Sequence, residues 1–474
     1  MTQTNEAALH APKSMPEHPH ARGGAVLRLL GAQGLIFLAA FAFLVAFSPL
    51  SSNALGAAHI LAKVKALLGQ QTSSTPVPAA PEKEIAPSFA TSRVEVLALP
   101  LYLLATVSEK PSMTSTGASE QSTNKIAIVI ILLAAHALCA FGVARFFSLC
   151  RRSLPVAESL LVTAALIATP YSVFAKTLLP CSLAAALLIG SLGSLFANHP
   201  LRAGLFLAAA VLCDHCLIYL VPLFAIELWR RGNLLSLARM LLPVALAGAS
   251  FLLMPSNGAL DIPSPIPRDS LPKCLLELAK GVSTLFPFLL LSVGGLLLLV
   301  KNSPHEAVFA GGSALLTALL GATAGRASPL ILWTDVVYLT PFLLLLALPL
   351  VSRLARTCLG QVAVDLLLIW GALQVLPALM ANADSFVASR KLGPSLSPLR
   401  DVLFLQAESL FLEKSPLLFV LAVSASLWLV ALARRQSIEN EQSLPKPMLV
   451  VKRFLWAQAA YVLAVVLFLS VRAC

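Results

Sequence analysis

Long apolar runs alternate with short polar segments along almost the whole chain, beginning near residue 29. Each long run has close to the 20 residues that an α-helix needs to cross a hydrocarbon core of about 30 Å. The pattern therefore predicts an all-α, polytopic integral membrane protein. The runs predicted to span are residues 29–49, 126–147, 154–174, 178–197, 235–254, 282–300, 308–324, 330–350, 360–380, 416–432 and 455–470.

Two further apolar segments do not read as simple spans. Residues 94–107 are too few to cross a bilayer, so we expect them to be interfacial or half-inserted. Residues 203–228 are long enough for one crossing, but Asp214 and His215 interrupt the centre. Polar groups at that depth are costly unless they face protein or water. The total is about 11–13 transmembrane or re-entrant helices.

Basic residues predict the orientation, because Lys and Arg in short loops mark the cytosolic side of a membrane protein. If residues 203–228 crossed once, the arginines that follow them would lie on the wrong side. A re-entrant hairpin that turns at Asp214–His215 removes this conflict for all later loops. The arginines placed in the cytosol are Arg22, Arg28, Arg145, Arg151, Arg152, Arg230, Arg231, Arg353, Arg356, Arg434 and Arg435.

These assignments divide the chain into three parts. Residues 1–28 are a cytosolic N-terminal tail, and the first span acts as a signal anchor. Residues 29–453 form the polytopic membrane domain, and residues 454–474 carry an additional C-terminal transmembrane helix. The luminal loops are predicted near residues 51–125, 255–281 and 381–415.

The composition agrees with a membrane protein and argues against binding to nucleic acid. Only 12% of residues are charged and 58% are hydrophobic, which leaves too little polar surface for a soluble fold. The net charge of +12 comes mainly from the scattered cytosolic arginines and lysines. No block of basic residues with interleaved aromatics is present, so membrane lipids, not nucleic acid, are the expected partner of this charge.

The central part of residues 203–228 contains the first candidate chemistry. Cys213 and Cys216 have the CxxC spacing of zinc and redox sites, but the chain has no second CxxC. We therefore expect no metal site and read these cysteines as buried thiols. Asp214 and His215 are either functional polar groups inside the membrane or a structural pair that binds the backbone of the turn.

Asp335 and Tyr338 lie near the non-cytosolic end of the predicted span 330–350. Asp335 follows Thr334, so it either faces a ligand or caps the start of the helix. No catalytic Ser/His/Asp set and no phosphate-binding loop is recognisable. These patterns therefore predict no catalytic residue and no cofactor.

Membrane glycosyltransferases that use polyprenyl-phosphate sugars have about as many helices and a large first luminal loop. They carry a paired acidic motif just after the first span, where a carboxylate acts as general base. Here residues 47–53 (FSPLSSN) contain no acid. Glu82 and Glu84 form the only acidic pair of the loop, in a Pro- and Ala-rich stretch. The architecture fits this class and the catalytic residues do not.

Four short segments stand out, and they are residues 47–52 (FSPLSS), 168–176 (ATPYSVFAK), 334–336 (TDV) and 447–452 (PMLVVK). They resemble the PIG-U family, a subunit of the glycosylphosphatidylinositol (GPI) transamidase. Residues 47–52 resemble the start of that family's first luminal loop, and residues 168–176 resemble its Asn-Pro-Tyr-Thr-Ile stretch. Residues 334–336 (TDV) are similar to its Gly-Asp-Val, and residues 447–452 (PMLVVK) to its C-terminal end. Residues 413–416 (EKSP) replace its Asn-rich luminal motif. The segments occur in the family's order.

The resemblance implies a glycosyltransferase-C-like helical scaffold that has lost its catalytic acids. It implies a non-catalytic, multi-pass subunit of the GPI transamidase in the endoplasmic reticulum membrane, which binds or presents the GPI lipid. The other subunits, including a caspase-like catalytic subunit, would then be partners. The residues expected to bind the lipid are Asp335, Tyr338, Asp214, His215, Lys176 and Ser415.

Three other functions stay open at this point. The chain could be a GPI mannosyltransferase that uses dolichol-phosphate-mannose, with its acids at other positions. It could be a membrane transporter, which the intramembrane Asp and His weakly favour although no inverted repeat is evident. It could also be a purely structural scaffold.

Overall fold

The computed structural model describes residues 19–47, 57–68, 92–108, 116–175, 178–231, 234–253, 287–323, 329–357, 360–368 and 371. Within these ranges every regular element is a helix, as the sequence predicts. The elements are α1 (Pro19–Phe47), α2 (Ala57–Leu67), α4 (Val94–Ser108), α5 (Thr116–Cys150), α6 (Val156–Ile167), α7 (Pro170–Ala175), α8 (Pro180–Phe196), α9 (Pro200–Cys213), η1 (His215–Leu220), α10 (Val221–Arg231), α11 (Leu234–Leu253), η2 (Pro287–Leu290), α13 (Leu291–Asn302), α14 (Pro304–Thr323) and α15 (Pro329–Leu354).

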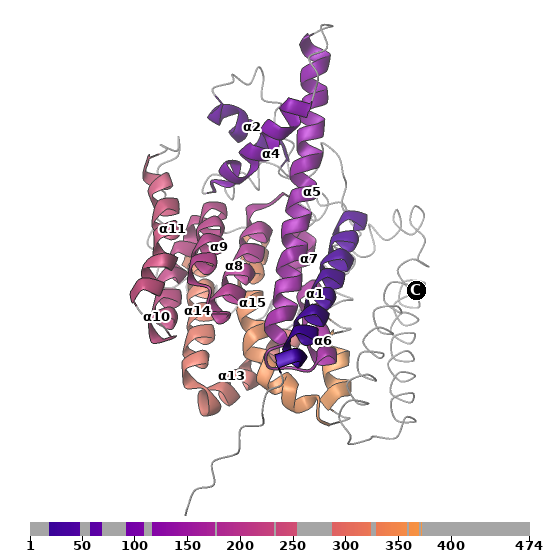
Figure 1. Ribbon diagram of the computed structural model, residues 1–474, viewed down its shortest axis with the longest axis vertical. Helices are drawn as coiled ribbons and strands as arrows, with labels where there is room; N and C mark the ends of the chain where they lie inside the picture. Colours follow the sequence, from indigo (N-terminus) through magenta and orange to yellow (C-terminus); the bar gives the residue numbers. More distant parts are fainter. Residues whose placement is uncertain are drawn as a thin grey trace, which may run out of the picture.

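The helices form a bundle around α8 (Figure 1). α8 packs against α5 on one side and α9 on the other, and α9 packs against α11. α13, α14 and α15 form a second group that meets α8 through α15. Every residue of α8 from Pro180 to Leu195 is buried, so this helix is the centre of the core. α2 and α4 lie together at the upper end of the bundle in Figure 1.

The predicted span 154–174 is wrong as a single helix, because the structure divides it into α6 and α7. α6 ends at Ile167 and α7 begins at Pro170. Pro170 has no backbone N–H to donate and disfavours helical backbone at Thr169. The hydroxyl of Thr169 turns back and donates to the carbonyl of Leu166 at 2.6 Å. The motif 168–176 therefore builds a break in a buried helix.

The segment 203–228 contains the reversal that the sequence predicts. α9 ends at Cys213, Asp214 is extended, and η1 leads into α10. At the end of α10, the guanidinium of Arg231 lies 4.6 Å from the ring centre of Phe196, the last residue of α8. At the other end, the carbonyl of Leu212 accepts from the backbone N–H of Arg93. The chain thus turns at Asp214 and returns, and we call this unit the α9–α10 hairpin.

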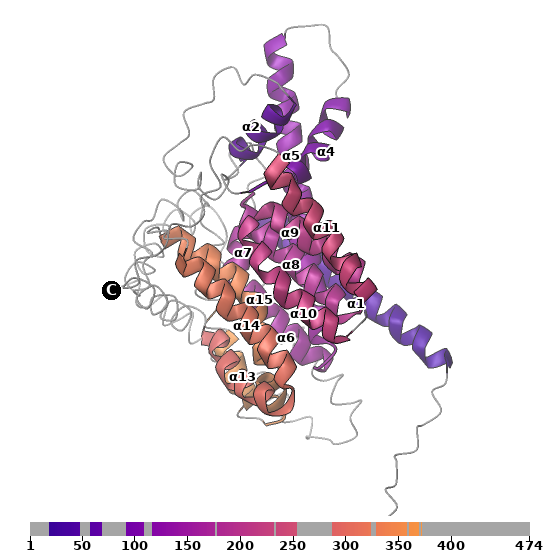
Figure 2. The ribbon, with the colours of Figure 1, turned by 90° about the vertical axis from the view of Figure 1, so that its left-hand side faces the viewer.

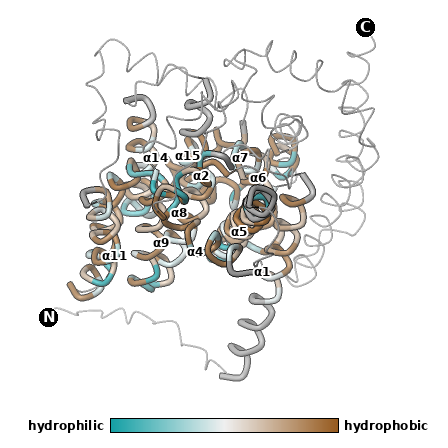
Figure 3. The backbone as a smooth tube through the Cα atoms, turned by 90° about the horizontal axis from the view of Figure 1, so that it is seen from above, coloured by the Kyte–Doolittle hydropathy of each residue, from teal (hydrophilic) through white to brown (hydrophobic). Residues whose placement is uncertain are grey.

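Three described helices are long and apolar enough to cross a membrane, namely the segments Asn124–Cys150, Leu234–Phe251 and Val336–Leu354. The segment in α11 is only 22% buried. Its outward leucines include Leu234, Leu242 and Leu246, which are 72%, 63% and 66% exposed. Hydrophobic stretches follow α11 and α14 at the rim of the bundle (Figure 3). A row of exposed leucines on one helix is unfavourable in water and suits contact with lipid.

Several predicted boundaries shift in the structure. α1 begins at Pro19, so the tail predicted to end at residue 28 is partly helical. α5 begins at Thr116, inside the predicted loop 51–125, and α2 and α4 also lie in that loop. The predicted interfacial segment 94–107 is α4, which packs on α5 and α2 (Figure 2). The predicted loops 255–281 and 381–415, the spans 416–432 and 455–470 and most of 360–380 lie outside the described residues.

Close packing of helices explains two glycines. A Cβ atom on Gly204 would meet the backbone of Met240 in α11, with the Met240 Cα at 2.8 Å. A Cβ atom on Gly295 would overlap the backbone carbonyl of Leu346 in α15. In both places the absence of a side chain lets two helices touch through their backbones.

Candidate functional site

Asp214 lies at the tip of the α9–α10 hairpin and caps η1. Its φ and ψ are −146° and 111°, which end α9, and its Oδ1 accepts a hydrogen bond from the backbone N–H of Cys216 at 3.0 Å. A short acidic side chain at this position satisfies a donor that the start of a helix leaves unpaired. The structural alternative for Asp214, binding to the backbone of the turn, is therefore observed.

Asp214 also makes a long-range contact. The hydroxyl of Tyr338 in α15 donates to Asp214 Oδ2 at 2.7 Å, across 124 residues of sequence. Tyr338 is 7% exposed, and the Asp214 side chain is 17% exposed. The two oxygens of one carboxylate thus hold the tip of the hairpin and join it to α15. The structure brings together two of the residues that the sequence selected.

His215 is the third predicted residue at this tip. Its Nδ1 lies 3.9 Å from Asp214 Oδ1, and its Nε2 lies 3.8 Å from the Sγ of Cys216. The imidazole ring is 6.2 Å from the ring of Phe251 in α11. The site therefore has one acid, one imidazole and one phenol in contact, and all three are partly or fully shielded from solvent.

The same tip offers three atoms of the kinds that bind metals. The ligand atoms of Asp214, His215 and Cys216 lie within 4.8 Å of one another. Zinc uses this set of side chains, yet a structural site needs four ligands. Both oxygens of Asp214 already accept hydrogen bonds, and Cys213, the other member of the CxxC pair, is fully buried in the core. The donor set is therefore incomplete for a structural metal, and we assign none.

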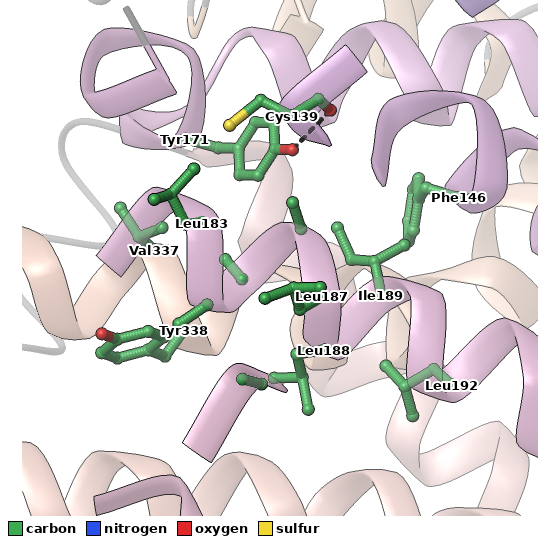
Figure 4. Packing of buried hydrophobic residues seen from close by; sticks show 14 of the residues in the cluster. Cys139, Phe146, Tyr171, Leu183, Leu187, Leu188, Ile189, Leu192, Val337 and Tyr338 are labelled. Carbon is green, nitrogen blue, oxygen red and sulfur yellow. Dashed lines mark hydrogen bonds between the residues drawn. The ribbon is translucent and has the colours of Figure 1, made fainter. Parts of the chain in front are cut away.

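Tyr338 belongs to an apolar layer with residues of α5, α7 and α8 (Figure 4). Tyr171 in α7 donates to the carbonyl of Cys139 in α5 at 2.7 Å, and Leu183 and Val337 lie in the same layer. Cys139, like Cys213, is 0% exposed and unpaired. The prediction of a buried thiol is confirmed for Cys213 and wrong for Cys216, which is partly exposed.

A charged group next to the site was missed by the sequence analysis. Glu95 of α4 is 3% exposed and lies 3.5 Å from the Nζ of Lys63 and 3.6 Å from Arg93. The backbone N–H of Arg93 donates to the carbonyl of Leu212, and its guanidinium lies 5.6 Å from the ring of Phe251. The first loop is thereby fastened to the hairpin beside Asp214. The only sign in the sequence was a basic and an acidic residue, Arg93 and Glu95, placed two apart just before an apolar run.

The remaining predicted residues have different outcomes. Asp335 lies in α15, one turn before Tyr338, and its side chain is outside the described residues. Because α15 begins at Pro329, Asp335 is inside the helix and the capping alternative for it is wrong. Lys176 and Ser415 are both outside the described residues.

Searches with the whole chain find no matching family model, curated protein or solved structure.

Proposed function

We propose that this protein is a non-catalytic, lipid-binding subunit of a GPI transamidase in the endoplasmic reticulum membrane. The observation that carries the proposal is the hydrogen bond between Tyr338 and Asp214. It links the tip of the hairpin to the helix that contains residues 334–336, one of the segments that resemble the PIG-U family. α7, which belongs to a second such segment, packs against the same helix. Two segments chosen by resemblance thus lie in, or pack against, the helix that carries Tyr338.

The depth of the site supports recognition of a lipid headgroup. Asp214 follows Arg202 by 12 residues in α9, and Tyr338 precedes Arg353 by 15 residues in α15. At 1.5 Å per residue these separations are about 18 and 22 Å. If the arginines mark the cytosolic face, both estimates put the polar pair about two thirds of the way across a core of about 30 Å. The pair then lies about 8–12 Å below the luminal edge of the core, so a luminal lipid would have to bring its hydroxyl-rich headgroup that far into the protein to bind there.

The contacts at the site favour binding over catalysis. A general base must face the proton that it takes from the substrate. Both oxygens of Asp214 already accept hydrogen bonds that hold the hairpin tip and α15, and each keeps one further lone pair for a ligand. The acidic pair of the glycosyltransferases is absent from residues 47–53. A carboxylate and a phenol held together are suited to binding sugar or inositol hydroxyls, which both donate and accept.

One observation favours a second function, a GPI mannosyltransferase that uses dolichol-phosphate-mannose. Glu95 is a buried carboxylate of the first loop close to the end of α9, and its Oε2 makes no hydrogen bond. An acid of this loop beside Asp214 is what a sugar transferase would require. Lys63 and Arg93 neutralise Glu95, and for that reason we rank this function second.

Lipid profiles of depleted cells distinguish the two functions. For a transamidase subunit, we expect fewer GPI-anchored proteins on the cell surface and an accumulation of complete GPI precursors. Accumulation of an under-mannosylated precursor would refute the proposal and favour the mannosyltransferase. Purification in mild detergent should also recover a caspase-like subunit with the protein.

Substitutions at Asp214 test binding against catalysis in the same cells. Asp214→Asn keeps an oxygen for the Cys216 N–H and an amide that can bond the Tyr338 hydroxyl, so most surface reporter should return. Asp214→Ala should restore much less. Equal, complete loss with both variants at normal expression would indicate a general base and contradict the binding role. Tyr171→Phe, which removes a buried hydroxyl that bonds Cys139 and not Asp214, is the matched control.

A further inference from the structure

Five arginines gather at one end of the bundle although they come from distant parts of the sequence. The α9–α10 hairpin returns Arg231 to the end of α8, where its guanidinium lies 4.6 Å from the Phe196 ring. Partial desolvation lowers the pKa of Arg152, and the nearby charges of Arg231 and Arg145 lower it further. Arg145 in turn is close enough to Arg202 for their charges to repel. We call Arg145, Arg152, Arg202, Arg230 and Arg231 the arginine cluster.

The protein compensates only part of this charge. Glu227 is 4% exposed and accepts from Arg230 at 2.8 and 3.2 Å and from Arg231 at 2.5 Å. The hydrogen bonds to Glu227 raise the pKa of Arg230, and the negative charge of Glu306 raises this pKa further. Within the described residues, no carboxylate forms an ion pair with Arg145, Arg152 or Arg202. The cluster therefore keeps an excess of positive charge in a small region.

Two of the guanidinium groups are held in fixed positions. Arg145 lies 5.3 Å from the ring centre of Phe141, and its Nε is buried without a hydrogen-bond partner. Arg231 is held between Glu227 and Phe196. Freely solvated arginines need neither a ring nor a buried carboxylate to position them. Ordered guanidinium groups with donors to spare are typical of sites that bind phosphate oxygens in pairs.

We propose that the arginine cluster binds the phosphate of an anionic phospholipid headgroup in the leaflet that faces this end of the bundle. The site is separate from Asp214, which lies at the other end of α9, about 18 Å away by helix rise. The proposal rests on the proposed orientation, in which these arginines lie at the cytosolic face of the membrane. It does not depend on GPI binding. A bound phosphate would offset the mutual repulsion of the arginines and fix the hairpin against α5 and α8.

Binding to the full-length protein in neutral detergent tests the site. The probes are short-chain phosphatidic acid, short-chain phosphatidylcholine and inorganic phosphate. We expect saturable binding of phosphatidic acid and much weaker binding of the other two. Arg152→Gln combined with Arg202→Gln should weaken it by at least about tenfold, because charge-assisted bonds to phosphate are lost. This variant leaves the pairs of Glu227 intact, so folding should be preserved.

The matched control removes two other exposed arginines at the end of α15, Arg353→Gln with Arg356→Gln. The proposal requires this control to bind within about twofold of the parent protein. Equal weakening of both double variants would mean diffuse surface charge and would overturn the site. Equal binding of inorganic phosphate would overturn its assignment to a lipid. The binding measurements contain no GPI. A failure of the arginine-cluster proposal is therefore distinguishable from a failure of the transamidase proposal.

Discussion

The contact between Asp214 and Tyr338 predicts a strong energetic coupling between the hairpin and α15. The perturbations are Asp214→Ala, Tyr338→Phe and the two together. Asp214→Ala removes the acceptor for the Tyr338 hydroxyl and for the Cys216 N–H. Tyr338→Phe removes only the hydroxyl. Both single variants therefore remove the same hydrogen bond between Tyr338 and Asp214. The double variant loses this bond only once, so its effect should be smaller than the sum of the two single effects.

The structure sets the size of the effect. A hydrogen bond to a charged group contributes about 1.5–3 kcal/mol, and a helix cap contributes about 1 kcal/mol. Tyr338 is 7% exposed, so its hydroxyl would stay unpaired in Asp214→Ala. We expect that variant to lower the free energy of unfolding by about 2.5–4 kcal/mol and Tyr338→Phe by about 1.5–3 kcal/mol. The double variant should fall short of their sum by about 1.5 kcal/mol or more.

Unfolding of the purified protein from mixed micelles by a denaturing detergent measures these differences. Tyr171→Phe serves as the control because its hydroxyl bonds the neutral carbonyl of Cys139 at the same distance, 2.7 Å. Its cost should be about 0.5–1.5 kcal/mol. Among the described residues it shares no hydrogen-bond partner with Asp214, so its effect should add to that of Asp214→Ala.

A coupling below about 0.5 kcal/mol, the usual error of additivity, would refute the reasoning. The Tyr338 hydroxyl and the Asp214 carboxylate would then not stabilise each other, and the polar site that we propose would lack its link to α15. A coupling of the same size between Asp214 and Tyr171 would also refute it, because the effect would then be a general loosening of the core.

Two further predictions concern the hairpin. Gly204→Ala should destabilise the protein by about 1–3 kcal/mol in the same unfolding assay, because the new methyl group meets the Met240 backbone. Gly248→Ala is the control and should cost little, because its Cβ would lie 3.7 Å from the Ile218 side chain. A cysteine at Gly232, just after Arg231, should react with an impermeant maleimide only from the cytosolic side of sealed microsomes. Reaction from the lumen would mean that the segment crosses the membrane once and would contradict the proposed orientation.

Helical class and most helix positions could be predicted from the sequence, because apolar run length directly limits what a segment can do. The predicted span 178–197 corresponds to α8, and the span 235–254 corresponds to α11. Hydropathy failed at the segment 154–174, where Thr169 and Pro170 break a run that is apolar on average. A hydropathy pattern averages over residues, whereas a break depends on single backbone donors and torsions.

The site could be predicted only in part. Asp214 and His215 were selected because polar groups are expensive within apolar sequence, and that cost is local. The partner of Asp214 was not predictable, since Tyr338 is 124 residues away and many hydroxyls were available. Glu95 was missed for a related reason. A single acid before an apolar run looks like a flanking charge until the fold buries it against Arg93 and Lys63.

The sequence by itself determined that the chain is helical and strongly apolar, and that it reverses near Asp214. These properties follow from side-chain transfer free energies and charge placement, which are fixed residue by residue. Only the tertiary structure decided that α8 is the centre of the core, that Tyr338 meets Asp214, and that Arg231 lies against Phe196. Those contacts depend on how helices far apart in the chain pack together, and the local sequence does not encode that packing.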